Sequence, residues 1–230
     1  TGKALIVRAC SLVYKKSMYI NSLIKNRILE NDFQIFDPKE KSINASSFRE
    51  DYIKLRNYIS NLPMNSGIGI KLPKDHRYIM TMMACMESGV FYVPMAEAYP
   101  ENRINQIQTE TDFTLEMNQT VFSEILSSET DLNFEPKACG PDEVIYKICT
   151  SGSTGKPKAV VVQRKSTEHF FKWVSEKFSH INTEDKILQV TEFTFDISLI
   201  DIALFLGRGG ALYFSEFKGC LLYTSDAADE

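Results

Sequence analysis

The sequence lacks the patterns that mark several common protein classes. Its five cysteines are scattered with no C-x-x-C pair, and its three histidines show no metal-ligand spacing. This cysteine usage predicts free thiols in a reducing compartment. A net charge of −4 gives no indication of nucleic-acid binding, and no apolar run reaches the length of a membrane span. We therefore expect a cytoplasmic protein with no metal site and with neither nucleic-acid nor membrane partners.

The two ends of the chain carry signals that bear on its boundaries. No signal peptide is visible at the start, and the first residue is Thr1 rather than Met, which indicates that this N-terminus is not the native one. At the other end, Cys220–Glu230 resembles the translation of a transposase-type sequencing adaptor. The alternative is a genuine acidic C-terminus. We expect the natural sequence to stop near Gly219, and we exclude the tail from fold reasoning.

The body of the chain alternates between helical and strand patterns. Helices are expected over residues 15–30, 47–62, 75–88, 101–109, 166–178 and 197–206, and strands over 67–72, 90–94, 113–115, 144–149, 160–162, 187–190 and 211–214. Ser47–Glu50 has the spacing of a capping box, and Gly89 is expected to end the Met-rich helix before it. Val121–Pro141 is polar and aperiodic, which predicts a surface connection. The alternation predicts an α/β fold, mainly a parallel sheet flanked by helices.

A run of small, hydroxylated and basic residues, Thr150–Lys158, separates two β-branched stretches. Glycines allow the backbone to approach a ligand closely, while N–H groups, hydroxyls and lysines suit phosphate oxygens. The run is not a Walker loop, because Pro157 and Ala159 stand where Gly and Ser/Thr are required, and because a strand rather than a helix should follow. Composition alone leaves two readings open, a polyphosphate-binding loop and a solvated hairpin loop.

The segment Ile148–Val160 resembles the signature loop of the adenylate-forming (AMP-binding) superfamily. That superfamily includes acyl-CoA synthetases, luciferases and the amino-acid-activating domains of nonribosomal peptide synthetases. Ala159 departs from the pattern, since the family usually has Gly there. A second segment, Glu87–Pro94 followed by Ala98–Ile104, resembles a structural helix–Gly–strand–Pro element of the same family. The resemblance assigns the following residues to the phosphates of ATP: Thr150, Ser151, Gly152, Ser153, Thr154, Gly155, Lys156 and Lys158. For Lys156 an ordinary exposed loop lysine is an equal alternative.

The segment Phe193–Ser198 resembles the family's entry to the acyl-substrate pocket. In amino-acid-activating members, an Asp at the position of Asp196 receives the α-ammonium group of the substrate, by a charge-assisted hydrogen bond. The plainer alternative is that Asp196 caps the helix beginning near Ile197, and the two roles are compatible. Asp201 lies roughly 140° further around an ideal helix, so we expect it to be structural or solvated. With Phe170–Trp173, the pattern also resembles the D-alanine–carrier-protein ligases.

The resemblance implies a two-step reaction. A carboxylate reacts with ATP to give an acyl-adenylate and pyrophosphate, with Mg²⁺ sharing the phosphate charge, and the acyl group then passes to a thiol. That thiol is expected on the phosphopantetheine of a carrier-protein domain or on coenzyme A. The family's catalytic lysine lies in a C-terminal lid that this sequence does not contain, so no catalytic residue is assigned and the chain alone should be inactive.

This reading divides the chain into a lead-in (residues 1–46), a truncated AMP-binding N-terminal domain (47–219) and the foreign tail (220–230). Three functions follow as candidates. The first is part of an amino-acid-adenylating enzyme. The second is part of an acyl- or aryl-CoA ligase, which would not need the carboxylate of Asp196 because its substrates carry no α-amine. The third is a non-catalytic nucleotide-binding or interaction domain.

Overall fold

The fold is described from a computed structural model, which covers residues 19–37, 42–128, 139–151 and 157–215. The elements run in the order α2 (Tyr19–Ile24), the π-helix η1 (Lys25–Glu30), β1 (Gln34–Phe36), α3 (Ala45–Ser60), β2 (Gly67–Ile70), α4 (His76–Ser88), β3 (Phe91–Pro94), α5 (Glu101–Thr111), β4 (Leu115–Met117), α6 (Gln119–Ser127), β5 (Val144–Ser151), β6 (Pro157–Gln163), α7 (Arg164–Lys177), β7 (Lys186–Gln189), the 3-10 helix η2 (Asp196–Ser198), α8 (Leu199–Arg208) and β8 (Ala211–Phe214). The tail 220–230 and residues 1–18 of the lead-in lie outside these ranges.

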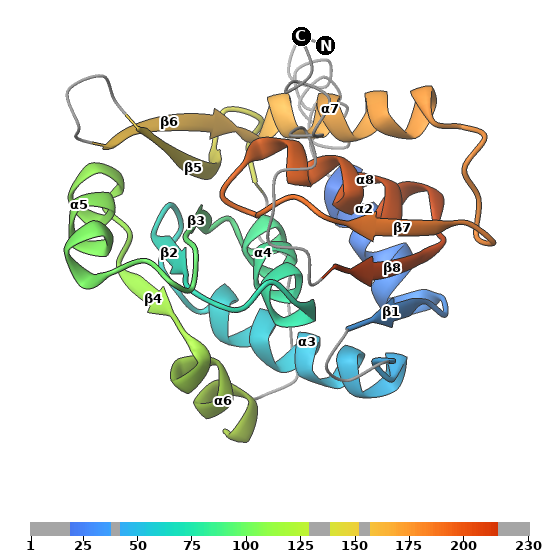
Figure 1. The fold of residues 1–230 in the computed structure, drawn as a ribbon, viewed down its shortest axis with the longest axis horizontal. Helices are drawn as coiled ribbons and strands as arrows, with labels where there is room; N and C mark the ends of the chain where they lie inside the picture. Colours follow the sequence, from blue (N-terminus) through green and yellow to red (C-terminus); the bar gives the residue numbers. More distant parts are fainter. Residues whose placement is uncertain (1–18, 38–41, 129–138, 152–156, 216–230) are drawn as a thin grey trace, which may run out of the picture.

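The strands form two sheets rather than one (Figure 1). The first has the order β4-β2-β3-β5-β6 and is parallel except for the antiparallel pair β5–β6. The second has the order β1-β8-β7 and is parallel throughout. The predicted α/β fold with mainly parallel strands and flanking helices is therefore confirmed.

Helix α4 lies at the centre of the core, between the two sheets (Figure 1). Every residue from 78 to 88 is buried, so this helix has no solvent face. The side chain of Asp75 accepts a hydrogen bond from the Arg77 backbone N–H at 2.9 Å and caps its start. Gly89 ends it in the left-handed conformation with φ 69°, which confirms the predicted glycine stop.

Helix α3 begins differently from the prediction. Its N-cap is Asn44, whose Oδ1 accepts the backbone N–H groups of Ser46 and Ser47 at 2.9 and 3.0 Å. Ser47 is therefore inside the first turn, and the predicted capping box Ser47–Glu50 is wrong. Asn is as good a cap as Ser, and here it lies three residues earlier in the chain.

The stretch 121–141 is not simply a surface connection, because its start belongs to helix α6. The Asn118 side chain caps this helix by accepting a hydrogen bond from the Val121 N–H at 3.1 Å. Within the helix, Phe122 and Ile125 are buried. The predicted helix from Ser166 in fact starts at Arg164. The predicted strand 113–115 is displaced to β4.

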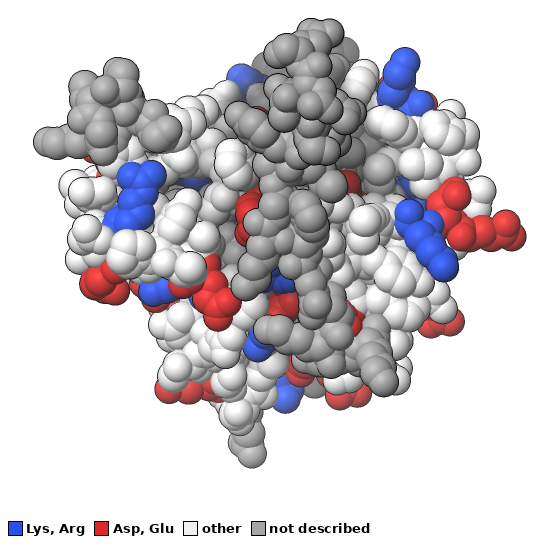
Figure 2. Space-filling model, in the orientation of Figure 1, with Lys and Arg blue, Asp and Glu red and all other residues white. Residues whose placement is uncertain are grey.

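No helix within the described ranges is long and apolar enough to cross a membrane. On the face shown in Figure 2, lysines and arginines are interspersed with acidic residues among the described side chains.

Candidate functional site

The phosphate-loop candidate is the connection of a β-hairpin. Strands β5 and β6 pair in antiparallel register, with Thr150 opposite Lys158 and Ser151 opposite Pro157. Residues 152–156 join these ends, so Gly152, Ser153, Thr154, Gly155 and Lys156 all lie outside the described residues. The strand after the loop is confirmed, which agrees with the exclusion of a Walker loop, where a helix would follow.

Two of the predicted phosphate-binding side chains can be placed. Thr150 and Lys158 are both exposed, and the Thr150 hydroxyl lies 3.5 Å from the main-chain oxygen of Lys158. Their paired positions place both residues at the described ends of the connection.

A cavity of about 360 Å³ lies between the hairpin, helix α7 and the segment η2–α8. It is lined by Tyr146 from β5, Val162 from β6, Ser166, Thr167 and Phe170 from α7, and Asp196, Ile197, Leu199 and Ile200 from η2 and α8. A larger depression of about 640 Å³ lies along α6 and its C-terminal end. We assign no function to it, because a single surface helix supplies nearly all of its lining and none of the predicted site residues reaches it.

Asp196 is the first residue of η2 and is exposed at this cavity. Phe195 occupies the N-cap position, and no side-chain capping bond is formed, so the predicted capping role of Asp196 is wrong. The carboxylate is close enough to Tyr146 to act on it electrostatically. Burial raises the pKa of Tyr146 to about 12, and the negative charge of Asp196 contributes in the same direction.

Asp201 does not share this site. It is partly buried on α8 and does not line the cavity, as its angular separation from Asp196 predicted. Burial raises the pKa of Asp201 to about 6, and the positive charge of Lys74 offsets part of that shift.

Helix α7 supplies cavity residues that sequence reasoning missed. Ser166, Thr167 and Phe170 line the cavity from its first two turns. The sequence marked Phe170 as part of an apolar helical face and of the segment Phe170–Trp173 that resembles the D-alanine–carrier-protein ligases, but not as a cavity residue. Nothing in the spacing of these residues distinguishes a cavity wall from ordinary core packing.

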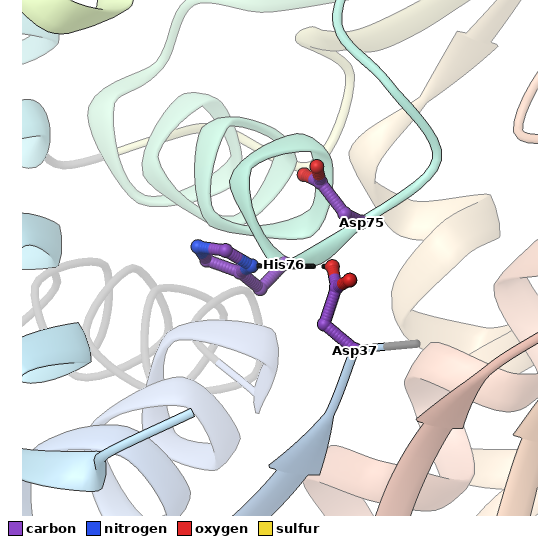
Figure 3. A group of neighbouring side chains, drawn as sticks. All are labelled: Asp37, Asp75 and His76. Atoms are coloured by element: carbon purple, nitrogen blue, oxygen red, sulfur yellow. Dashed lines mark ion pairs between the residues drawn. The ribbon is translucent and has the colours of Figure 1, made fainter. Parts of the chain in front are cut away.

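One cluster of potential metal ligands lies away from this cavity, formed by Asp37, Asp75 and His76 (Figure 3). One donor atom from each lies within 4.8 Å of the others, and His76 Nδ1 is 3.6 Å from Asp37 Oδ2. Asp75 already caps α4, and both of its oxygens accept hydrogen bonds from the Arg77 guanidinium. The cluster is therefore accounted for by its role at the start of the helix.

Sequence comparisons match this chain to known proteins. A family profile described as "AMP-binding enzyme" matches residues 41–221. Tyrocidine synthase 3 of Brevibacillus parabrevis is 30% identical over 166 residues, which are 66% of this chain and 2% of that protein. A dimodular nonribosomal peptide synthase of Bacillus subtilis (strain 168) is 26% identical over 210 residues, covering 79% of this chain and 9% of that protein.

Solved structures show the same fold. The N-terminal subdomain of Klebsiella oxytoca NpsA, solved with 3-hydroxyanthranilyl-AMSN, superposes with a TM-score of 0.73 at 19% identity, covering 90% of this chain and 54% of that one. ATP-bound MatB from Rhodopseudomonas palustris gives a TM-score of 0.72 at 12% identity, covering 88% and 46%. The chain thus spans about half the length of these solved chains and a small part of the curated relatives. With the family profile matched over most of its length, it belongs to the AMP-binding, adenylate-forming enzyme family.

Proposed function

We propose that this chain is part of an enzyme that activates an amino acid as its acyl-adenylate with ATP. The observation that carries the proposal is a shared cavity. Tyr146 and Val162, from the two strands that lead into and out of the phosphate-loop candidate, line the same cavity as Asp196. A nucleotide held by the loop and an amino acid held by Asp196 would then lie along the same hairpin, and adenylate formation requires that the two be brought together.

The hairpin fits the phosphate groups of ATP. Thr150 offers a hydroxyl, and Lys158 an exposed ammonium group, on facing positions of the ladder. Residues 152–156 would complete the grip through backbone N–H groups and the hydroxyls of Ser153 and Thr154. ATP supplies the adenylyl group and the pyrophosphate leaving group, and Mg²⁺ shares the phosphate charge. The part played by this chain is to position and neutralise that leaving group.

Asp196 fits the ammonium group of the substrate. The carboxylate is exposed at the cavity and makes no capping bond, so its oxygens can accept hydrogen bonds from a ligand. An ion pair at such a boundary gains from the charge-assisted hydrogen bond without the full desolvation cost of a buried pair.

We further propose a thiol acceptor on the phosphopantetheine of a carrier-protein domain, and a cytoplasmic location. The support is that curated relatives include peptide synthases of two bacteria. Within the same proposal, the enzyme could belong to the D-alanine–carrier-protein ligases, which the sequence pattern also resembles. Residues 47–219 would form the truncated N-terminal domain of that enzyme.

The proposal is tested at the nucleotide site. Titration of the chain with ATP and Mg²⁺ should show binding that weakens at least fivefold in Lys158→Ala. Lys172→Ala is the matched control, since it removes an exposed lysine from α7, away from the hairpin. Equal affinities in all three proteins would count against a role for the hairpin in nucleotide binding.

A second measurement addresses catalysis. Because the family resemblance assigns the catalytic lysine to none of residues 1–230, we expect these residues alone to show no amino-acid-dependent ATP–pyrophosphate exchange above background. Exchange with any amino acid would show that our assignment of the catalytic lysine is wrong.

The acyl- or aryl-CoA ligase remains the second candidate. The fold favours neither candidate, because the solved structures NpsA and MatB are only 19% and 12% identical to this chain and show the fold alone. The carboxylate of Asp196 favours the amino-acid candidate, because a carboxylic acid without an amine would meet a negative charge at the cavity. The third candidate, a non-catalytic nucleotide-binding domain, would gain support if the complete gene kept the loop and lacked the lid lysine.

A further inference from the structure

We infer that the cavity beside Asp196 selects an amino acid whose side chain is uncharged and mainly apolar. This inference rests on the proposed function, because it takes Asp196 as the receptor for the ammonium group. It goes further by naming the chemical class of the rest of the substrate, which the sequence alone did not indicate.

The charge of the cavity lining limits the charge of the ligand. Of the nine described residues that line the cavity, Asp196 alone carries a formal charge. Tyr146 is also ionisable, but its pKa of about 12 keeps the phenol neutral. One carboxylate can neutralise one cation. A second charge on the ligand would therefore enter the cavity without an opposite charge, which costs its desolvation free energy.

The walls of the cavity are mainly apolar. Val162, Phe170, Leu199 and Ile200 come from three different elements and give the cavity apolar lining. Ser166 and Thr167 add only neutral hydroxyl groups. Thr167 is 3% exposed, and its Oγ1 has no hydrogen-bond partner among the described residues. Such a lining binds aliphatic or aromatic groups by burial of apolar surface, while a neutral hydroxyl tolerates small polar groups.

Asp196 and the apolar lining differ in their exposure to solvent. Asp196 is exposed, whereas Leu199 is 4% exposed and lies deeper in the wall. A ligand with its ammonium group at Asp196 would direct its side chain toward the apolar lining. A volume of about 360 Å³ lies in the range of ordinary small-molecule sites, so it admits a bulky side chain.

The experiment compares four probes by saturation-transfer NMR and calorimetric titration: L-leucine, L-glutamate, L-lysine and 4-methylpentanoate. The last has the same carbon skeleton as leucine without the amine. L-Leucine should bind at least tenfold more tightly than each of the others, with saturation strongest at its methyl groups. Asp196→Asn should reduce leucine affinity to that of 4-methylpentanoate, whereas Glu176→Gln, which removes an exposed carboxylate from α7, should leave it unchanged.

Three results would overturn the inference. The first is binding of L-glutamate or L-lysine within a factor of ten of L-leucine, and the second is no detectable leucine binding at millimolar concentrations. The third is equal binding of leucine and 4-methylpentanoate, which would show that the ammonium group plays no part in recognition. The ATP titration of Lys158→Ala is independent of these measurements. Equal ATP affinity in the parent protein and Lys158→Ala, with leucine selectivity intact, would therefore count against the proposed function and leave the cavity assignment standing.

Discussion

The guanidinium of Arg164 donates a hydrogen bond from Nη2 to the main-chain oxygen of Met86. Arg164 is the first residue of α7 and follows β6 directly, while Met86 lies in the last turn of α4. Nη1 also lies 3.4 Å from Asn21 Oδ1 on α2. One side chain, only 2% exposed, thus joins the strand that leaves the phosphate-loop candidate to the central helix.

Replacement of Arg164 by Met should destabilise the protein by about 2–4 kcal/mol. Met retains much of the apolar volume, but it leaves the Met86 oxygen and the Glu168 carboxylate buried without their cationic partner. Urea unfolding followed by circular dichroism measures the change. Lys165→Met is the matched control, since Lys165 is exposed and pairs only with Asp142 at the surface, and it should change stability by less than about 0.5 kcal/mol. Equal losses in the two variants would contradict this account.

Gly89→Ala should destabilise the protein by about 1–2 kcal/mol, because residue 89 has φ 69° and this left-handed backbone conformation is unfavourable for Ala. The added Cβ would also lie 3.1 Å from the Sγ of Cys139. Gly140→Ala is the control, since the nearest atom to its Cβ is Glu143 Oε1 at 3.7 Å and its φ is not positive. Thermal unfolding of both variants measures the difference, and a Gly89→Ala protein as stable as the control would show that the cap is not strained by a side chain.

Asn44→Ala should cost about 1 kcal/mol of unfolding free energy, because two backbone N–H groups of α3 lose their acceptor. Ser47→Ala should cost much less, since Ser47 lies inside the first turn and is not the cap. The pair can be compared by urea denaturation under identical conditions. A larger loss in Ser47→Ala would restore the capping box that the sequence suggested.

Glu168 should make stability fall as pH rises through the weakly acidic range. Burial raises the pKa of Glu168 from its ordinary 4.5 to about 7, although the positive charge of Arg164 acts against the shift. The folded state therefore holds this proton more tightly than the unfolded chain, so the contribution is full below pH 4.5 and is lost as pH approaches 7.

Glu168→Gln removes this titration. As pH rises from 4.5 to 7, the free energy of unfolding of the variant should increase by about 1 kcal/mol relative to that of the parent protein. This value is reduced for residual solvent screening. Urea midpoints measured at half-unit pH steps give the difference. Asp201 titrates with the same sign, so the slope of the parent is not expected to vanish entirely in the variant. Parallel pH profiles for the two proteins would contradict the assignment to Glu168.

The sequence predicted most elements because their periodicity and stop signals are local. The helix from Asp75 to Gly89 is the clearest case, with a polar cap at one end and a glycine at the other. Helix α6 was missed because only Phe122 and Ile125 carry its buried face, too few to give a period. The start of α3 was misplaced because Asn44 and Ser47 are both good caps, and only the surrounding fold decides between them.

The candidate site was predicted less completely than the fold. Thr150, Lys158 and Asp196 were identified by family resemblance, and the structure places Asp196 at a cavity that the hairpin strands also line. Phe170 could not be identified in this way, because its contribution depends on how α7 packs beside η2. The division of the strands into two sheets was also hidden, since strand order is set by pairing between residues far apart in sequence.

The second sheet has a consequence for how the chain acquires its structure. Strand β1 pairs with β8, and β8 with β7, so β1 has no strand partner in this sheet until the C-terminal part of the described chain is present. Pairings of such long sequence separation slow folding, because the entropy of closing the intervening loop is lost before the contact forms. During synthesis β1 would stay unpaired in this sheet until β8 has been made, and the side chain of Ile35, buried in the folded protein, would be exposed in the meantime.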